Sequence, residues 1–236
     1  MKCRYFTNKQ LTRGGALITW ALFSIGAGAP SLVRAEAPRW EETLPALRVQ
    51  VDARRNRIWV LNSDAVYLYD IPTRRLIKRI ELPDWLFVRE VYSCAPDLTL
   101  APSGAALVTS NVLPTIWEVD PQSLAARQHR LSLDADNDKD VGFTGLAFGR
   151  GGRDLFGVSS LLGSAWRIDL GARKAHKVRL SEPIHGACGL VVLDREVPKA
   201  GDAASVLCIA GPRIASSVEL TSDMSEGRTI SAPCSQ

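Results

Sequence analysis

A short phrase of alternating residues that ends in an acidic residue recurs four times along the chain. The copies are "AVYLYD" ending at Asp70, "TIWEVD" ending at Asp120, "SAWRID" ending at Asp169, and "SSVEL", which puts Glu219 in the same place. Successive acids are 49 or 50 residues apart. Self-similarity at a fixed period of this length indicates a repeat architecture, in which each unit buries its apolar surface against its neighbours.

Each phrase belongs to a longer unit with the same order of parts. The units span 47–82, 98–133, 146–180 and 190–232, and the last has a longer first turn. Period-two alternation, β-branched and aromatic residues and regular turn signals predict four strands in each unit. Four strands at a period of about 50 residues are typical of a β-propeller blade. The sequence therefore predicts an all-β chain, a propeller of about four four-stranded blades or an incomplete propeller.

The repeated acids fall where the third strand of each unit turns into the fourth. An acidic side chain at this point can accept backbone N–H bonds and hold the turn. We therefore interpret Asp70, Asp120, Asp169 and Glu219 as structural residues. The aromatic residues just before them are expected to pack between blades rather than stack on a ligand.

The first 35 residues have the pattern of a secretory signal peptide. A basic start is followed by the apolar run 15–29 and by "VRA" at 33–35, a small-x-small cleavage signal. The alternative is an uncleaved anchor, but the apolar run is shorter than the roughly 20 residues of a spanning helix. We expect a signal peptide at 1–35, a segment at 36–46 that helps to close the ring, and a propeller domain at 47–236. The mature protein is then periplasmic or secreted, with no stable membrane insertion.

Charge and cysteine content change once this segment is set aside. Residues 1–35 hold five basic residues, which leaves 24 Lys and Arg against 25 Asp and Glu. No basic excess remains that would favour a nucleic acid partner. Four cysteines of an exported chain allow two disulfides. Adjacent strands of the fourth unit predict Cys188–Cys208, which leaves Cys94–Cys234, and free buried thiols are the alternative.

The blade pattern resembles the YVTN/WD-like group of bacterial exported β-propellers. The segments "LAPSGAALVTSN", "IWEVD" and "RLIKRIEL" carry the resemblance, which extends over about residues 47–232. It implies the architecture but no single activity, because the group is similar to lactonases, amine dehydrogenase heavy chains and binding or scaffolding proteins. Its members usually have roughly six to eight blades, whereas four are found here. A closed four-bladed ring, an open half that pairs with a second copy, and a shortened relative remain as alternatives.

Binding residues are expected on the face where inter-blade loops meet the loops between second and third strands. The ligand or partner candidates on this face are Trp85, Arg89, Glu90, Asn62 and Asn111. The alternative for Trp85 is a loop that folds over the ring and buries its aromatic residues. His185 lies in an inter-blade loop and is a weak candidate for a general base, although a loop histidine is more often a surface residue.

The stretch "DADNDKD" contains four alternating carboxylates, at Asp134, Asp136, Asp138 and Asp140. Hard oxygen ligands at this density suit Ca²⁺, and the alternative is a solvated acidic turn. No other cofactor is predicted.

Three functions are compatible with these patterns. The sequence favours a non-enzymatic propeller that binds a protein or a small ligand on one face. The protein partner can be a second copy of the chain, which gives a homodimer. The second function is a metal-dependent, lactonase-like hydrolase that uses the inter-blade loops. The third is an accessory subunit of a periplasmic redox enzyme, whose partner would carry the cofactor.

Overall fold

The computed structural model describes six ranges of the chain, all within the unit Glu42–Gln236: residues 46–88, 94–135, 141–149, 152–195, 204–211 and 215–230. The predicted signal peptide 1–35 and the predicted closing segment 36–46, apart from its last residue, lie outside these ranges and stay predictions. Within these ranges the regular structure is all β apart from one turn of 3-10 helix, η2 (Ala53–Arg55). No helix in the described ranges is long and apolar enough to cross a membrane.

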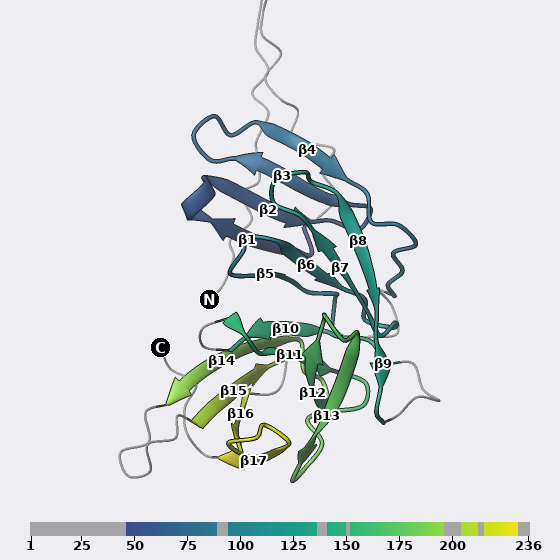
Figure 1. Ribbon diagram of the computed structural model, residues 1–236, viewed down its shortest axis with the longest axis vertical. Helices are drawn as coiled ribbons and strands as arrows, with labels where there is room; N and C mark the ends of the chain where they lie inside the picture. The colour runs from purple at the N-terminus through teal and green to yellow at the C-terminus, as the bar shows by residue number, and fades with distance from the viewer. Residues whose placement is uncertain are drawn as a thin grey trace, which may run out of the picture. The chain divides into compact units, whose positions relative to one another are not determined.

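Within the described ranges, sixteen of the strands form four antiparallel groups of four, each in chain order, and the last two groups belong to one nine-stranded sheet. Blade 1 holds β1 (Arg48–Asp52), β2 (Arg57–Leu61), β3 (Val66–Asp70) and β4 (Leu76–Ile80); blade 2 holds β5 (Leu98–Leu100), β6 (Ala106–Thr109), β7 (Thr115–Val119) and β8 (Ala126–Arg130). Blade 3 holds β10 (Gly145–Phe148), β11 (Leu155–Ser159), β12 (Ser164–Asp169) and β13 (Lys174–Leu180); blade 4 holds β14 (Gly189–Arg195), β15 (Ala204–Ala210), β16 (Ala215–Leu220) and β17 (Glu226–Ile230). The predicted all-β fold of four four-stranded propeller blades is confirmed (Figure 1).

The blades stack through their apolar faces. We call the side of a blade toward the preceding blade its a face, and the side toward the following blade its b face. Alternating residues of each strand belong to opposite faces, so one strand supplies both. Three core clusters join blade 1 to blade 2, blade 2 to blade 3, and blade 3 to blade 4. Among the described residues, no core cluster joins blade 4 to blade 1.

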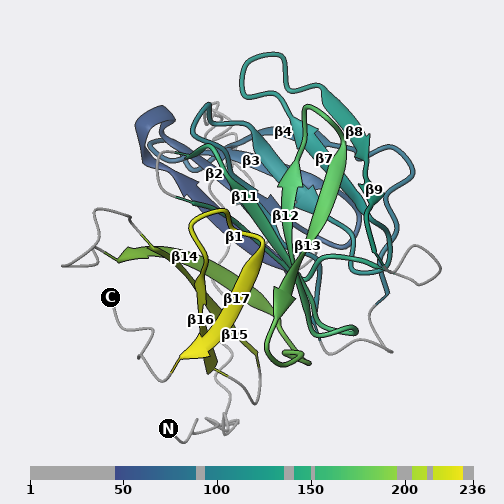
Figure 2. The same ribbon diagram turned by 60° about the horizontal axis from the view of Figure 1, so that its bottom comes forward.

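The innermost strands also follow one another in space. β1 contacts β5, β5 contacts β10, and β10 contacts β14. At the outer edge, β13 pairs in parallel with β17 through Arg179↔Glu226 and Leu180↔Gly227 (Figure 2). A short strand, β9 (Ser132–Leu133), pairs in parallel with the other end of β13. The outer strand of blade 3 therefore links the end of blade 2 to blade 4.

Three of the four repeated acids hold the turn after the third strand. Their carboxylates accept backbone N–H bonds: at Asp70 from Thr73 (2.8 Å), at Asp120 from Ser123 (2.7 Å) and at Asp169 from Ala172 (2.8 Å). Hydrogen bonds from the Thr73 hydroxyl and amide lower the pKa of the Asp70 carboxyl, and those from the Ser123 and Gln122 amides lower the pKa of the Asp120 carboxyl. The turn geometry, not a ligand, thus accounts for the acids.

Glu219 does not occupy the same place. It lies inside β16 and forms a 3.0 Å ion pair with Arg228 of β17. The blade 4 turn starts two residues later, where the Thr221 amide bonds to the Glu226 carbonyl. Asp223 accepts hydrogen bonds from the Thr221 hydroxyl (2.6 Å) and from Ser225, which lower its pKa to about 2. Glu219 is therefore a cross-strand ion-pair residue, and Asp223 carries the turn function.

The cysteine pairing differs from the prediction. Cys94 and Cys188 form a disulfide, with their Cα atoms 4.9 Å apart. The predicted pairs Cys188–Cys208 and Cys94–Cys234 are therefore wrong, although the presence of a disulfide is confirmed. Cys208 is also disulfide-bonded, and Cys234 lies outside the described residues. The error arose because strand adjacency was used, whereas the bond joins two loops that precede different blades.

Candidate functional site

The loop after blade 1 is folded onto blade 2. Trp85 is half-buried, donates its Nε1–H to the Thr109 carbonyl (2.9 Å) and stacks on Phe87 with ring centroids 4.7 Å apart. The Ser110 hydroxyl donates to the Leu86 carbonyl at 2.5 Å. These contacts favour the buried-aromatic alternative for Trp85 over an exposed ligand anchor. Arg89 and Glu90 lie outside the described residues, and their binding role stays a prediction.

Asn111 braces the same loop. Its side-chain amide donates to the Val88 carbonyl (2.6 Å) and the Cys94 carbonyl (3.1 Å), and its oxygen accepts from the Val88 amide (2.9 Å). The residue is 3% exposed. The structure thus gives Asn111 a loop-holding role. Asn62 is also buried, and its Oδ1 has no hydrogen-bond partner among the described residues.

The remaining candidates on this side of the molecule do not come together. His185 is exposed, and its Nδ1 lies 3.2 Å from the Leu161 carbonyl. Asp134 contacts the His176 ring at 3.1 Å and accepts from the Lys177 amide at 2.9 Å. Asp136, Asp138 and Asp140 lie outside the described residues. Within the described residues no group of three His, Cys, Asp or Glu side chains is placed to hold a metal, and the Ca²⁺ site stays a prediction.

Two hollows lie away from the predicted face residues. One of about 670 Å³ is bordered by Asp134, Ser164, Lys177 and Arg179. Another of about 650 Å³ lies among the first hairpins of blades 1 and 2 and the start of the blade 3 hairpin, near Val51, Leu100 and Phe148. Both are open hollows whose lining is more apolar than polar, although the first also has the charged groups of Asp134, Lys177 and Arg179 at its border.

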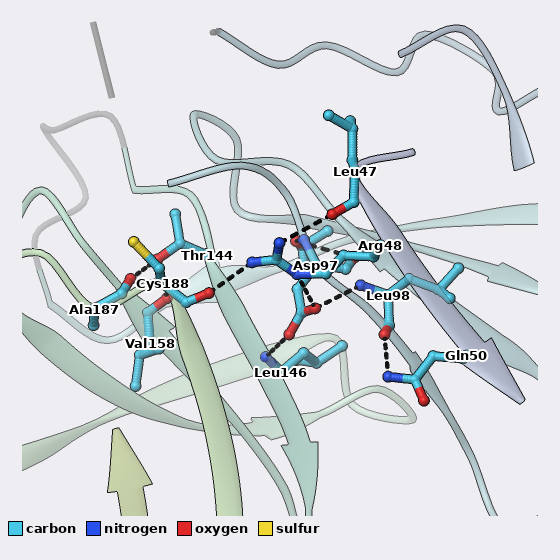
Figure 3. A network of polar contacts seen from close by, with 11 residues as sticks. Leu47, Arg48, Gln50, Asp97, Leu98, Thr144, Leu146, Val158, Ala187 and Cys188 are labelled. Atoms are coloured by element: carbon cyan, nitrogen blue, oxygen red, sulfur yellow. Dashed lines mark hydrogen bonds and ion pairs between the residues drawn. The ribbon is translucent and has the colours of Figure 1, made fainter. Parts of the chain in front are cut away.

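The starts of the four inner strands meet in a polar network that we call the hub (Figure 3). Arg48 donates to the Asp97 carboxylate (3.0 Å) and to the Cys188 carbonyl (2.7 Å). The other Asp97 oxygen accepts from the Leu146 amide at 2.8 Å. One side chain from blade 1 and one from the start of blade 2 therefore connect all four blades. The Cys94–Cys188 disulfide adds a covalent link between the loops that enter blades 2 and 4.

Electrostatics at the hub fit this linking role. Burial raises the pKa of the Asp97 carboxyl above its ordinary value, while the Leu146 amide and Arg48 act to lower it. A buried carboxylate is tolerated only when it is paired and hydrogen-bonded. Asp97 meets this condition because Arg48 and the amides of Leu146 and Leu98 all donate to it. Sequence reasoning missed the pair, which is separated by 49 positions.

Among the described residues, the blade stacking leaves the a face of blade 1 open. Register places two rows on it, Val49–Val60–Tyr67–Arg79 and Val51–Ile58–Tyr69–Leu76. Val49, Val51 and Leu76 are 52%, 59% and 50% exposed, and the central residues of both rows are half-buried. The alternating valines of "RVQVD", in the first of the four repeat units, were the sequence signal for this face. The described residues thus leave an apolar sheet face without a covering blade.

No protein-family model matches the sequence, and no curated protein matches it. The resemblance to YVTN/WD-like propellers therefore stays a prediction at the level of family. Solved structures are similar in fold at 11–14% sequence identity. Hydrazine synthase from Kuenenia stuttgartiensis aligns at a TM-score of 0.53 and 14% identity, covering 81% of this chain and 52% of that chain.

Two Bacteroides proteins are similar in the same way. A protein of unknown function from Bacteroides caccae aligns at a TM-score of 0.52 and 14% identity, over 81% of this chain and 62% of that chain. An auxiliary nutrient binding protein from Bacteroides thetaiotaomicron aligns at 0.50 and 11% identity, over 78% and 40%. The chain thus spans 40% to 62% of the length of these three structures. At these identities the likeness extends to the fold alone.

Proposed function

We propose that the chain is an exported, non-enzymatic binding module that docks a protein partner on the a face of blade 1. The observation that carries the proposal is the exposure of Val49, Val51 and Leu76 on one sheet face. Contiguous apolar surface is rare on soluble monomers and marks interaction sites. A protein partner fits this surface better than a small ligand does, because the face is an open sheet surface, and only its Val51 end borders a hollow.

Polar groups at the edge of the face support a specific contact. The Tyr67 hydroxyl donates to Asp64 (2.8 Å), and Arg79 pairs with Asp64 (3.2 Å) and with Glu81 (2.5 Å). An apolar centre with a hydrogen-bonded polar rim is the usual anatomy of a protein interface. Residues 48–80 carry eight Lys or Arg side chains against three Asp, which favours a partner with an acidic surface.

Export rests on two observations. The basic start, apolar run and "VRA" of residues 1–35 have the pattern of a secretory signal. The Cys94–Cys188 disulfide suits an oxidising compartment, since such bonds are rare in the cytosol. We therefore assign the binding function to the periplasm or the extracellular space.

Photo-crosslinking tests this proposal on the full chain. A photoreactive phenylalanine analogue is placed at Val51, with a matched control at Arg127, an exposed residue of β8. In bacterial cells that export the chain, we expect a light-dependent protein adduct from Val51 and none from Arg127, with the partner identified by mass spectrometry. Equal labelling from the two positions, or no adduct at Val51, contradicts the proposal.

A further inference from the structure

We infer that the protein docked on blade 1 is a second copy of this chain, and this inference rests on the binding function proposed above. The b side of β14 in one copy packs on β1 of the other. A second, identical contact forms between β14 of the other copy and β1 of the first. Together the two contacts join two copies of four blades into one ring of eight.

The first support is the equivalence of the open face to the buried ones. Tyr67 precedes Asp70 by three residues, as Trp117 precedes Asp120 and Trp166 precedes Asp169. Both tryptophans are fully buried, each on the a face of its blade. In blades 2, 3 and 4 the a face packs on the b face of the preceding blade. The a face of blade 1 is therefore built for the b face of another blade.

The second support is the matching surface on blade 4. Val191 pairs with Cys208, and Leu193 pairs with Val206, on the b side of that sheet. Val206 and Cys208 are already buried, but Val191 is 46% exposed and Leu193 is half-buried. The open part of this b face is thus the innermost strand, β14.

The same strand continues the series of inner-strand contacts. β1 contacts β5, β5 contacts β10, and β10 contacts β14. A contact from β14 to β1 of a second copy adds the next member of this series. Valine and leucine side chains on β14 then meet Val49 and Val51 of β1.

Charge and length support a copy of this chain as the occupant. Residues 189–230 hold six Asp or Glu against four Lys or Arg, opposite in sign to the basic blade 1. Complementary charges favour this pairing over blade 1 against blade 1. The solved structures of similar fold are longer, since the chain covers 40% to 62% of them. A head-to-tail contact that closes after two copies gives a discrete dimer rather than a filament.

Light scattering coupled to size-exclusion chromatography tests the inference on the oxidised chain. We expect a dimer for the unchanged protein, and monomers for Val51→Arg and for Val191→Arg. Leu161→Arg is the matched control: Leu161 is 47% exposed in the turn between β11 and β12, and this variant stays dimeric. Far-ultraviolet circular dichroism verifies that each variant is folded, because all three positions are exposed.

Mixing the two disrupted variants distinguishes a ring from other dimers. A ring of one Val51→Arg copy and one Val191→Arg copy contains one unchanged contact and one doubly changed contact. We therefore expect the mixture to recover dimer that neither variant forms alone. A dimer insensitive to Val191→Arg indicates contact between two blade 1 faces and overturns the ring. A monomer up to high micromolar concentration overturns the second copy, and an adduct from Val51 to a different protein then still supports the proposed function.

Discussion

The a faces of blade 1 and blade 2 carry the same pattern but differ in exposure. Val108 and Trp117 of blade 2 are fully buried against blade 1, whereas Val51 of blade 1 is 59% exposed. The residues of the two faces are similar, so composition does not explain the difference. What differs is the presence of a preceding blade. Each repeat unit therefore encodes an apolar a face suited to stacking. In blades 2, 3 and 4 that face is buried against the preceding blade, whereas in blade 1 it stays exposed.

The largest expected difference between the two faces comes from replacing their matched aromatic residues, Trp117 in blade 2 and Tyr67 in blade 1, by alanine. Trp117→Ala empties a buried site and removes the 2.7 Å hydrogen bond from Nε1 to the Pro83 carbonyl. We expect a loss of about 4 kcal/mol in the free energy of unfolding. Tyr67→Ala on the open face should cost about 1 kcal/mol or less in dilute protein, where the face is solvated. Urea unfolding at low protein concentration measures both, and equal losses would contradict the assignment of the open face.

Removing the covalent link gives the next largest effect. Replacing Cys94 and Cys188 by serine releases a bond between residues 94 positions apart. We expect a loss of about 3 kcal/mol, because the bond limits the freedom of the unfolded chain. Thermal unfolding of the double variant against the oxidised parent measures the loss. If the parent under reducing conditions unfolds at the same temperature as when oxidised, the disulfide does not stabilise the hub.

The hub and the open face each contain an aspartate paired with an arginine, and replacing these aspartates compares the two regions. Asp97→Asn leaves Arg48 and the Leu146 amide without their charged partner, and we expect a cost of about 2 kcal/mol. Asp64→Asn changes the exposed pair with Arg79 and should cost about 0.5 kcal/mol. Chemical denaturation of the two variants tests the order. A larger loss for Asp64→Asn than for Asp97→Asn would contradict the stabilising role of the hub.

Acidification tests the turn acids and is expected to have the smallest effect. The pKa values of Asp70, Asp120 and Asp223 are lowered by hydrogen bonds in the folded state. Below about pH 4 the unfolded chain thus binds more protons than the folded chain, so stability decreases as the pH falls toward 2. Unfolding midpoints at pH 5 and pH 2.5 measure the change, and Asp120→Asn should show a smaller decrease than the parent. If the unfolding midpoint of Asp120→Asn falls as much as that of the parent between pH 5 and pH 2.5, Asp120 does not contribute to the acid sensitivity.

Sequence patterns predicted what depends on neighbours within a repeat. Alternation and turn residues indicated four strands per unit, and the position of the repeated acids between the third and fourth strands indicated the acid-held turn. Patterns failed where residues of different units meet. The Cys94–Cys188 pair and the Arg48–Asp97 pair join loops that converge only after the blades have stacked. Glu219 was misassigned because β16 continues past it to Leu220, so that the turn begins only at Thr221.

The covalent loop closed by Cys94 and Cys188 also has a mechanical consequence. Blades 2 and 3 lie entirely between the two cysteines, so tension applied to the ends of the chain bypasses them. With 94 residues in the loop and about 3.4 Å per extended residue, roughly 320 Å of contour length is withheld from stretching. Under load, an oxidised molecule extends only outside this loop, and reduction of the Cys94–Cys188 bond releases the length that the loop holds.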